Sequence, residues 1–307
     1  MIDLHDRHIA VGGTALVGAP LAVAGTPHLI WCASDMLGDR IDRIRSMAAP
    51  RRAYDRLIVR PMLSRIERRI LAGCGRIATV SPYAASRIES VSPLSDRTIS
   101  HLPIPVDLKR FHPPPSLPKS GVIGFSGRMS DPRKNIRLLL DAVARADGQG
   151  AGVTALLAGD ATPALKQEVV RRGLEHVVRF VGTLPPDELP NFYQNLDVFV
   201  VPSRQEGLLI SGLEAAACGV PIVSARCGGP ECYGRDGETG FLTDFGAPEI
   251  SARIVQISAD RTLRARLSAN ARTTVESEFS HAAFADALDR EWCAIWGEPV
   301  DKYRDDV

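Results

Sequence analysis

The sequence predicts an α/β protein with doubly wound, parallel sheets in two Rossmann-like domains. Three observations lead to this prediction. Short apolar runs alternate with helical patterns along almost the whole chain. The runs are continuously apolar, which is typical of strands buried on both faces of a parallel sheet. Four prolines within FHPPPSLPKS, at residues 111–120, separate the two domains, because such a stretch continues neither a helix nor a strand.

Seven apolar runs are predicted strands. They occupy residues 28–33, 77–80, 122–126, 153–158, 177–181, 198–201 and 221–224. The uncharged segment at residues 9–27 precedes them and is predicted to be a buried helix. It contains mostly alanine with several glycines and prolines, and it follows an acidic stretch, so it resembles neither a membrane span nor a signal peptide.

Helix signals lie between the strands. Ser81 and Pro82 provide an N-cap and a first-turn proline. Residues 136–143 carry apolar side chains at i, i+3, i+4 and i+7, as one face of a helix requires. Gly219, followed by Pro221, marks the end of another helix.

These signals predict the domain boundaries. Residues 1–112 form a short first domain with few strands, and residues 113–120 form a proline-rich linker. Residues 121–280 form a second domain with a full set of strands, and residues 281–307 form a C-terminal helix.

The composition is that of a soluble globular protein, with 45% hydrophobic and 24% charged residues. A net charge of +1 gives no indication of nucleic-acid binding. Six scattered cysteines without a C-x-x-C pair are best explained as free thiols, so we expect a cytoplasmic protein.

One stretch is strongly basic. From Arg40 to Arg69 there are ten arginines against three acids. Two interpretations stay open: a solvated helix face, or a peripheral contact with anionic lipid or an anionic acceptor at the inner face of a membrane. We expect Pro61 to interrupt the helix of residues 58–71, which argues against a membrane-bound helix.

The second domain opens with GVIGFSGRMSDPRKNIRLLLDAV. A strand runs into Gly127 and Arg128, and a helix follows with Lys134 near its start. Two cations at the end of a strand and the beginning of a helix make an anion site, because the helix dipole and free N–H groups add to their charge. The alternative is a pair of solvated surface cations.

A second stretch, PSRQEGLLISGLEAAACGVPIV, follows the run at residues 198–201. Glu206 is predicted to lie in a loop and Glu214 in the helix after it, with unpaired N–H groups at residues 207–210 between them. This arrangement suits a nucleotide sugar, with the diphosphate at the helix start and a carboxylate for the hydroxyl groups at each end.

These residues also carry a resemblance. The E-x7-E pattern of Glu206 and Glu214 resembles that of the retaining glycosyltransferases of family 4, which have the GT-B fold. GFSGRMSDPRKNIRLLLDA, FVGTLPPDELPNFYQNLDVFVVPS and GRDGETGFLTD agree in order and spacing, and SHAAFADALDREW resembles the family's last helix, which crosses back to the first domain. ILAGCGRIATVSPYAASRI and LPIPVDLKRFHP resemble the end of its first domain.

The resemblance implies roles for individual residues. Arg128 and Lys134 would neutralise the donor diphosphate, Glu206 would hold the sugar, and Glu214 would hold the ribose. It implies neither a metal nor a cofactor, because the nucleotide-diphosphate sugar is a co-substrate. The catalytic residues would be Glu206, Arg128 and Lys134, and further donor contacts would come from Gly127, Val181, Thr183, Leu184, Gly207, Leu208, Leu209 and Ile210.

The sequence departs from the family in two places. IDLHDRH resembles a mid-domain strand and its loop, so the first domain is expected to be incomplete, without its early strands. Ala33, Ser34 and Asp35 stand where the family usually has a histidine. We therefore expect a retaining hexosyltransferase. The alternatives are a non-catalytic nucleotide-sugar-binding chain, on its own or as a subunit that needs a partner, and a GT-B-type sugar epimerase.

Overall fold

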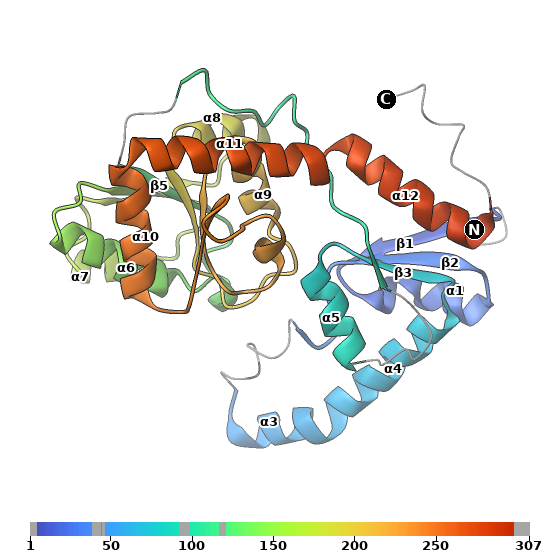
Figure 1. Ribbon diagram of the computed structural model, residues 1–307. Helices are drawn as coiled ribbons and strands as arrows, with labels where there is room; N and C mark the ends of the chain where they lie inside the picture. Colours follow the sequence, from blue (N-terminus) through green and yellow to red (C-terminus); the bar gives the residue numbers. More distant parts are fainter. Residues whose placement is uncertain (1–4, 39–43, 45–46, 92–98, 117–120, 298–307) are drawn as a thin grey trace. The chain divides into compact units, whose positions relative to one another are not determined.

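The computed structural model describes residues 5–38, 44, 47–91, 99–116 and 121–297. The chain divides into two compact units, one of residues 1–105 with 281–307 and one of residues 106–280 (Figure 1). Each unit contains one parallel sheet with helices, so the predicted α/β class is confirmed.

The second unit has six parallel strands in the order β10-β9-β8-β5-β6-β7. The strands are β5 (Val122–Ser126), β6 (Thr154–Ala158), β7 (Val178–Gly182), β8 (Val198–Val201), β9 (Ile222–Ala225) and β10 (Gly240–Thr243). In this order the chain runs outward from β5 to β7 and then returns to begin again at β8. The point where the direction reverses, between β5 and β8, is where ligands bind in open α/β sheets.

Helices cover this sheet. They are α6 (Ile136–Gly148), α7 (Pro163–Arg171), α8 (Leu189–Gln194), α9 (Ile210–Ala217), α10 (Ala247–Ala259) and α11 (Arg261–Glu278), with 3-10 turns η4 (Pro132–Lys134), η5 (Pro186–Glu188) and η6 (Gly229–Cys232). The apolar face predicted for residues 136–143 is confirmed, since Ile136, Leu139, Leu140 and Val143 are buried in the core.

A buried ion pair fastens α11 to the sheet. Asp197, immediately before β8, pairs with Arg264 of α11, and both side chains are inaccessible to solvent or nearly so. The same carboxylate accepts hydrogen bonds from the N–H groups of Gly121 and Val122 at the start of β5. Hydrogen bonds of this kind allow a charged pair to be buried.

The first unit has four parallel strands in the order β1-β2-β3-β4. They are β1 (His8–Gly12), β2 (His28–Cys32), β3 (Arg76–Thr79) and β4 (Ile99–His101). The helical elements are η2 (Ala15–Gly18), α1 (Ala19–Ala24), α3 (Ala49–Tyr54), the π-helix η3 (Asp55–Val59), α4 (Arg60–Gly73), α5 (Pro82–Val91) and α12 (His281–Trp296). Ser81 caps α5 as predicted, with its Oγ 3.1 Å from the N–H of Ala84.

The C-terminal helix belongs to this first unit. The ring of Phe284 in α12 lies 5.4 Å from that of Trp31 in β2. Arg76 of β3 donates a 2.7 Å hydrogen bond to Glu291 of α12. Buried Leu29 and Ala78 complete the apolar contact between α12 and the sheet.

The prediction of one buried helix at residues 9–27 was wrong. The segment forms β1, the turn η2 and the short helix α1, because His8–Gly12 pairs in parallel with His28–Cys32. The glycines that follow β1 and Pro20 in the first turn of α1 divide the segment. No helix among the described residues has both the length and the hydropathy to cross a membrane.

Two further expectations need correction. Residues 106–116 belong to the second unit, so the boundary lies before residue 106 and not in the proline-rich stretch predicted as the linker. The end of that predicted linker, residues 117–120, lies outside the described residues. Residues 106–112 are anchored in the second unit, since the N–H of Val106 bonds to the carbonyl of Phe279, and buried Phe111 packs on Tyr193 with ring centroids 6.1 Å apart. Pro61 does not interrupt the helix, because it occupies the first turn of α4 directly after the wider turn of the π-helix.

Candidate functional site

Two loops meet at the reversal point of the second sheet. One follows β5 and the other follows β8, and both leave the carboxyl ends of their strands. The side chain of Asn135 donates to the carbonyl of Pro202 at 3.2 Å, and the N–H of Arg204 donates to the carbonyl of Arg133 at 2.8 Å. The loops are therefore held together by hydrogen bonds.

An ion pair crosses between the same loops. Lys134 Nζ donates to Glu206 Oε1 at 2.8 Å, and the two side chains are only 12% and 11% exposed. Two residues 72 positions apart, both predicted as site residues from their motifs, thus lie in direct contact. The structure places a cation and a carboxylate at the point where this fold class binds ligands.

Glycines permit close packing beside Lys134. Gly127 has φ +153° and donates to the carbonyl of Ala158 at 3.0 Å. Gly159, after β6, has φ +130°, and a Cβ there would lie 2.0 Å from the carbonyl oxygen of Gly127. A Cβ on Gly127 would meet the Lys134 stem at 3.7 Å, so Gly127 and Lys134 are neighbours.

The start of α9 lies next to this pair in sequence and has an unusual backbone. Leu209, the residue before the helix, has φ +68° and ψ +82°, and its side chain forms no capping hydrogen bond. Non-glycine residues seldom adopt this conformation, which has an energetic cost. The first N–H groups of a helix lack partners within the helix and attract anions.

Tyr233 holds the strained turn. Its buried hydroxyl lies 3.2 Å from the carbonyl of Leu208 and 3.0 Å from that of Leu209. A Cβ on Gly212 would lie 2.4 Å from this hydroxyl, and a Cβ on Gly229 would lie 2.3 Å from the backbone of Gly207. The segment around η6 thus packs directly against the loop and determines its shape.

The backbone of Glu206 is fixed from the same side. Its N–H donates to the carbonyl of Cys227, and its own carbonyl accepts from the N–H of Gly229, both at 2.9 Å. Its side chain is thereby held where it meets Lys134.

Glu214 lies in α9 and has a different partner. The hydroxyl group of Tyr193 in α8 donates a hydrogen bond to Glu214 Oε2 at 2.9 Å. Burial raises the pKa of Glu214, while the hydrogen bond from Tyr193 and the charge of Arg110 act in the opposite direction. Sequence reasoning did not single out Tyr193 or Tyr233, because their partners are distant in sequence.

Some of the other predicted residues line a cavity of about 410 Å³ at the carboxyl ends of β5, β6 and β7. Four predicted donor contacts line it, namely Gly127, Arg128, Thr183 and Leu184, together with Ser126, Ala158, Gly159, Asp160 and Leu189. Val181 lies exposed on β7 and is not part of this lining. Among the described side chains, no group of three or more His, Cys, Asp or Glu could hold a metal ion.

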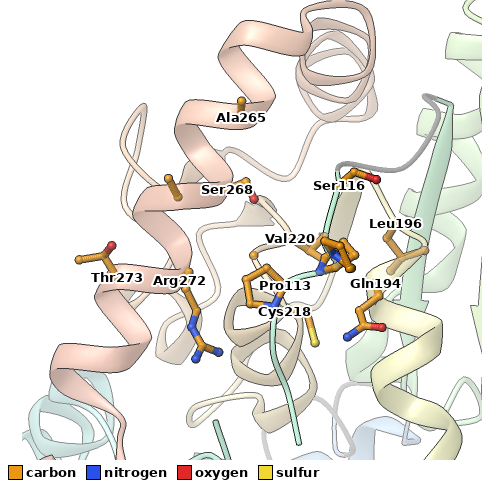
Figure 2. Close-up of a pocket in the computed structure, with 14 residues that line it drawn as sticks. Pro113, Ser116, Gln194, Leu196, Cys218, Val220, Ala265, Ser268, Arg272 and Thr273 are labelled. Carbon is orange, nitrogen blue, oxygen red and sulfur yellow. The ribbon is translucent and has the colours of Figure 1, made fainter. Parts of the chain in front are cut away.

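Another cavity, of about 450 Å³, lies near the amino ends of β8 and β9 (Figure 2). The proline stretch at residues 113–115 forms part of its wall, together with Leu196, Cys218 and residues of α11. Arg272 donates there to the carbonyls of Phe111 and Ala217, at 2.7 and 2.8 Å. None of the predicted site residues lines this cavity. Its Arg272 holds the chain segment with which the second unit begins.

The sequence is similar to a described protein family and to individual curated proteins. Residues 120–260 match the family described as "Glycosyl transferases group 1". The chain is 36% identical over 187 residues to the lipopolysaccharide core biosynthesis glycosyltransferase LpsE of Rhizobium meliloti, which covers 60% of this chain and 52% of that protein. The chain spans about half the length of the curated relatives it matches.

Solved structures share the fold. Sucrose-phosphate synthase from Thermosynechococcus elongatus matches with a TM-score of 0.76 and 23% identity, over 94% of this chain and 74% of that one. HepE from Anabaena, in complex with UDP-glucose, matches with a TM-score of 0.71 and 21% identity, over 91% and 76% of the two chains. At these identities the likeness shows the fold, which is of the GT-B type.

One solved structure corresponds to a single domain. It is the C-terminal domain of the group 1 glycosyltransferase LpcC from Francisella tularensis, with a TM-score of 0.52 and 25% identity, covering 57% of this chain and 99% of that one. It is similar to this chain over a length close to that of the second unit. The segment at residues 120–260, which holds the Lys134–Glu206 pair and the start of α9, is thus the part of the chain that matches the group 1 glycosyltransferases.

Proposed function

We propose that this chain is a retaining glycosyltransferase that moves a hexose from a nucleotide-diphosphate sugar to an acceptor hydroxyl. The observation that carries the proposal is the Lys134–Glu206 contact of 2.8 Å at the reversal point of the sheet, beside the start of α9. The description of LpsE as a glycosyltransferase supports sugar transfer. The HepE complex with UDP-glucose supports a nucleotide-sugar donor.

In this proposal the diphosphate lies at the start of α9. The N–H groups of residues 207–210 and the positive end of the helix dipole stabilise its charge, and Arg128 and Lys134 add two cations. The negative charge on the diphosphate increases as the bond to the sugar breaks. Groups already positioned for that charge lower the barrier, and no metal is required in this scheme.

The two carboxylates hold opposite ends of the donor. Glu206, with a fixed backbone, accepts hydrogen bonds from the sugar once Lys134 turns to the diphosphate. Glu214, held by Tyr193 at 2.9 Å, accepts from the ribose. The base lies against residues 181–184, beside the cavity of about 410 Å³.

The transfer itself is a substitution with retention. The acceptor oxygen forms a bond to the anomeric carbon on the face from which the diphosphate leaves. The acceptor proton passes to the leaving phosphate oxygen, so no protein base is consumed. The reaction is placed in the cytoplasm, where six cysteines without a disulfide stay reduced.

Thermal unfolding with nucleotides tests the donor site. UDP, GDP, ADP and their sugar conjugates are added separately to the full chain and to the Lys134→Ala variant. A ligand at a hundred times its dissociation constant adds about 2.7 kcal/mol, so one base should raise the midpoint by several degrees. The shift should be lost in Lys134→Ala and kept in Lys166→Ala, which removes an exposed lysine from α7. No shift with any nucleotide would overturn the proposal.

A second candidate is a non-catalytic nucleotide-sugar-binding chain, on its own or as a subunit that needs a partner. The end of β2, where the family usually has a histidine, favours this candidate: Asp35 is fully buried and bonded to Arg87 at 3.3 Å. Such a chain would show the same thermal shift but would transfer no labelled sugar to acceptors in a cell extract. Transfer that is lost in Glu206→Ala would exclude it. Isomerised sugar nucleotide formed without acceptor would indicate an epimerase instead.

A further inference from the structure

A helical arm in the first unit exposes apolar side chains. The arm comprises α3, the π-helix and α4, residues 49–73, and Figure 1 shows them end to end from the label α3 to the label α4. Among its apolar side chains, only Ile70 and Leu71 in the last turns are buried. Large apolar side chains along the rest are exposed: Tyr54 57%, Leu57 73%, Ile58 52%, Met62 48% and Ile66 37%.

These side chains form a stripe. Tyr54, Ile58, Met62 and Ile66 are each four residues apart, and the next position in the series, Ile70, is in the core. Side chains four apart lie on one face of a helix. The stripe therefore continues from the core onto the free surface of the arm. Contiguous exposed apolar side chains of this kind mark an interaction surface.

The same arm is strongly basic. Residues 49–73 contain seven arginines and only two acids. Both acids are buried: Asp55 bonds to Arg60 at 3.0 Å, and Glu67 accepts from the N–H of Met36 at 2.9 Å. The charge that the arm presents is thus almost entirely positive, although the net charge of the chain is only +1. Three other arginines of the basic stretch, Arg40, Arg43 and Arg45, lie outside the described residues.

We propose that this arm lies on the surface of an anionic lipid bilayer, with the apolar stripe among the acyl chains near the headgroups and the arginines on lipid phosphates. An amphipathic basic helix binds such a surface through both effects together. Arginine stems can extend along the apolar region and keep their charge at the phosphates. A tyrosine at the end of the stripe suits the interface between lipid and water.

The stripe distinguishes a bilayer from the other anionic partners. Nucleic-acid phosphates would neutralise the arginines but would leave Leu57, Ile58 and Met62 in water. An acidic protein helix would cover one face of the arm. Exposed arginines accompany the stripe along the arm: Arg51, Arg52, Arg56, Arg65, Arg68 and Arg69. A bilayer offers phosphates to the arginines that flank the stripe and an apolar interior to the stripe itself.

Vesicle flotation tests the proposal with the full chain. Vesicles of phosphatidylcholine alone are compared with vesicles of phosphatidylcholine mixed with phosphatidylglycerol, an anionic lipid. The protein should float with the anionic vesicles at low salt, at least tenfold more than with neutral ones, and salt should weaken this binding. Equal partition into both vesicle types, or into neither, would overturn the proposal.

Two pairs of variants separate the apolar and the charge contributions. Ile58→Glu with Met62→Glu, and Arg56→Glu with Arg65→Glu, should each reduce flotation by tenfold or more. Val170→Glu on α7 and Arg145→Glu on α6 change exposed positions of the second unit, serve as controls and should leave flotation unchanged. Equal loss in the controls would contradict a specific role of the arm.

Two other measurements separate the test of membrane binding from the test of the proposed glycosyltransferase function. The thermal shift with nucleotide should be the same in arm variants and parent, which also shows that the variants fold. Light scattering without lipid tests the rival in which the stripe joins two copies of the chain. A dimer that dissociates in Ile58→Glu with Met62→Glu, together with unchanged flotation, would overturn the proposal in favour of self-association.

Discussion

Glu67 shows how one buried residue can make stability depend on pH. It lies on the inner face of α4 with no solvent exposure, and only one of its oxygens has a hydrogen-bond partner among the described residues, the N–H of Met36. The pKa of Glu67 is raised from 4.5 to about 7, chiefly by burial. The bond from Met36 opposes this rise, the charge of Asp35 adds to it, and the charge of Arg87 opposes it. The folded chain therefore holds a proton that the unfolded chain has already released.

The sign of the effect follows from this difference. Below about pH 4.5 both states bind the proton, and between pH 4.5 and about 7 only the folded state does, so stability falls as pH rises through this window. About one pH unit above the folded pKa the loss is complete, at about 3 kcal/mol. Glu67→Gln keeps the acceptor for Met36 and cannot ionise. Urea unfolding should show that this variant gains stability over the parent from pH 5 to pH 8, whereas a constant difference would contradict the assignment.

The Lys134–Glu206 contact carries a second prediction at this scale. Each side chain is proposed to contact the donor directly, so Lys134→Ala and Glu206→Ala should each lower kcat/KM by a factor of about 10² or more, the effect of losing one positioned electrostatic group. A sugar-transfer assay measures this, with Lys166→Ala as the matched lysine control. If both variants kept the activity of the parent, the assignment of the site to this pair would be wrong.

At the scale of elements, the shape of the loop before α9 depends on the turn η6. Gly229 packs so closely on the loop that a Cβ there would lie 2.3 Å from the backbone of Gly207 and 2.4 Å from the N atom of Leu208. Backbone atoms cannot move away as the end of a side chain can. The loop whose N–H groups are proposed to bind the donor is thus shaped by a segment more than twenty residues away.

Gly229→Ala tests this dependence. Forcing a methyl group into the contact should destabilise the chain by about 1–3 kcal/mol and weaken nucleotide binding at least tenfold, because the loop must shift. Thermal unfolding and a binding titration measure the two effects. Gly148→Ala, at the end of α6 where an added Cβ would touch nothing within 4 Å, is the matched control and should be neutral or slightly stabilising. Unchanged binding in Gly229→Ala would show that the loop does not need this contact.

The elements also show which parts of the fold and the site can be predicted from the sequence. Residues 122–126 and 198–201 were predicted as strands with their exact bounds, since continuous apolar runs are a local signal. The spacing of Glu206 and Glu214 and the position of Lys134 are local too. The roles of Tyr193 and Tyr233 were not predictable, because each depends on a partner more than twenty residues away. The π-helix before Pro61 was missed because no residue pattern distinguishes it from a break in the helix.

At the scale of the whole molecule, the second unit contains everything that the proposed donor site needs. Its sheet order is complete around the reversal point, and a single apolar cluster joins strands β5 to β10 with α6, α7, α10 and α11. The entering segment is fastened within the same unit by the bonds of Arg272 to Phe111 and of Gln194 to His112. The buried Asp197–Arg264 pair connects β8 with α11, the last helix of the unit.

We therefore expect a fragment of residues 106–280 to fold alone and to bind the same nucleotide as the full chain, with a similar dissociation constant. The LpcC domain, solved by itself and similar to this chain over 57% of its length, indicates that such a domain can be independent. Calorimetry should show one cooperative transition that the nucleotide moves upward, and Lys134→Ala in the fragment should abolish the shift. Asp197→Asn, which leaves Arg264 with an uncompensated buried charge, should cost the fragment about 3–5 kcal/mol. A fragment that folds but binds more than tenfold more weakly than the full chain would show that residues of the first unit contribute to nucleotide binding.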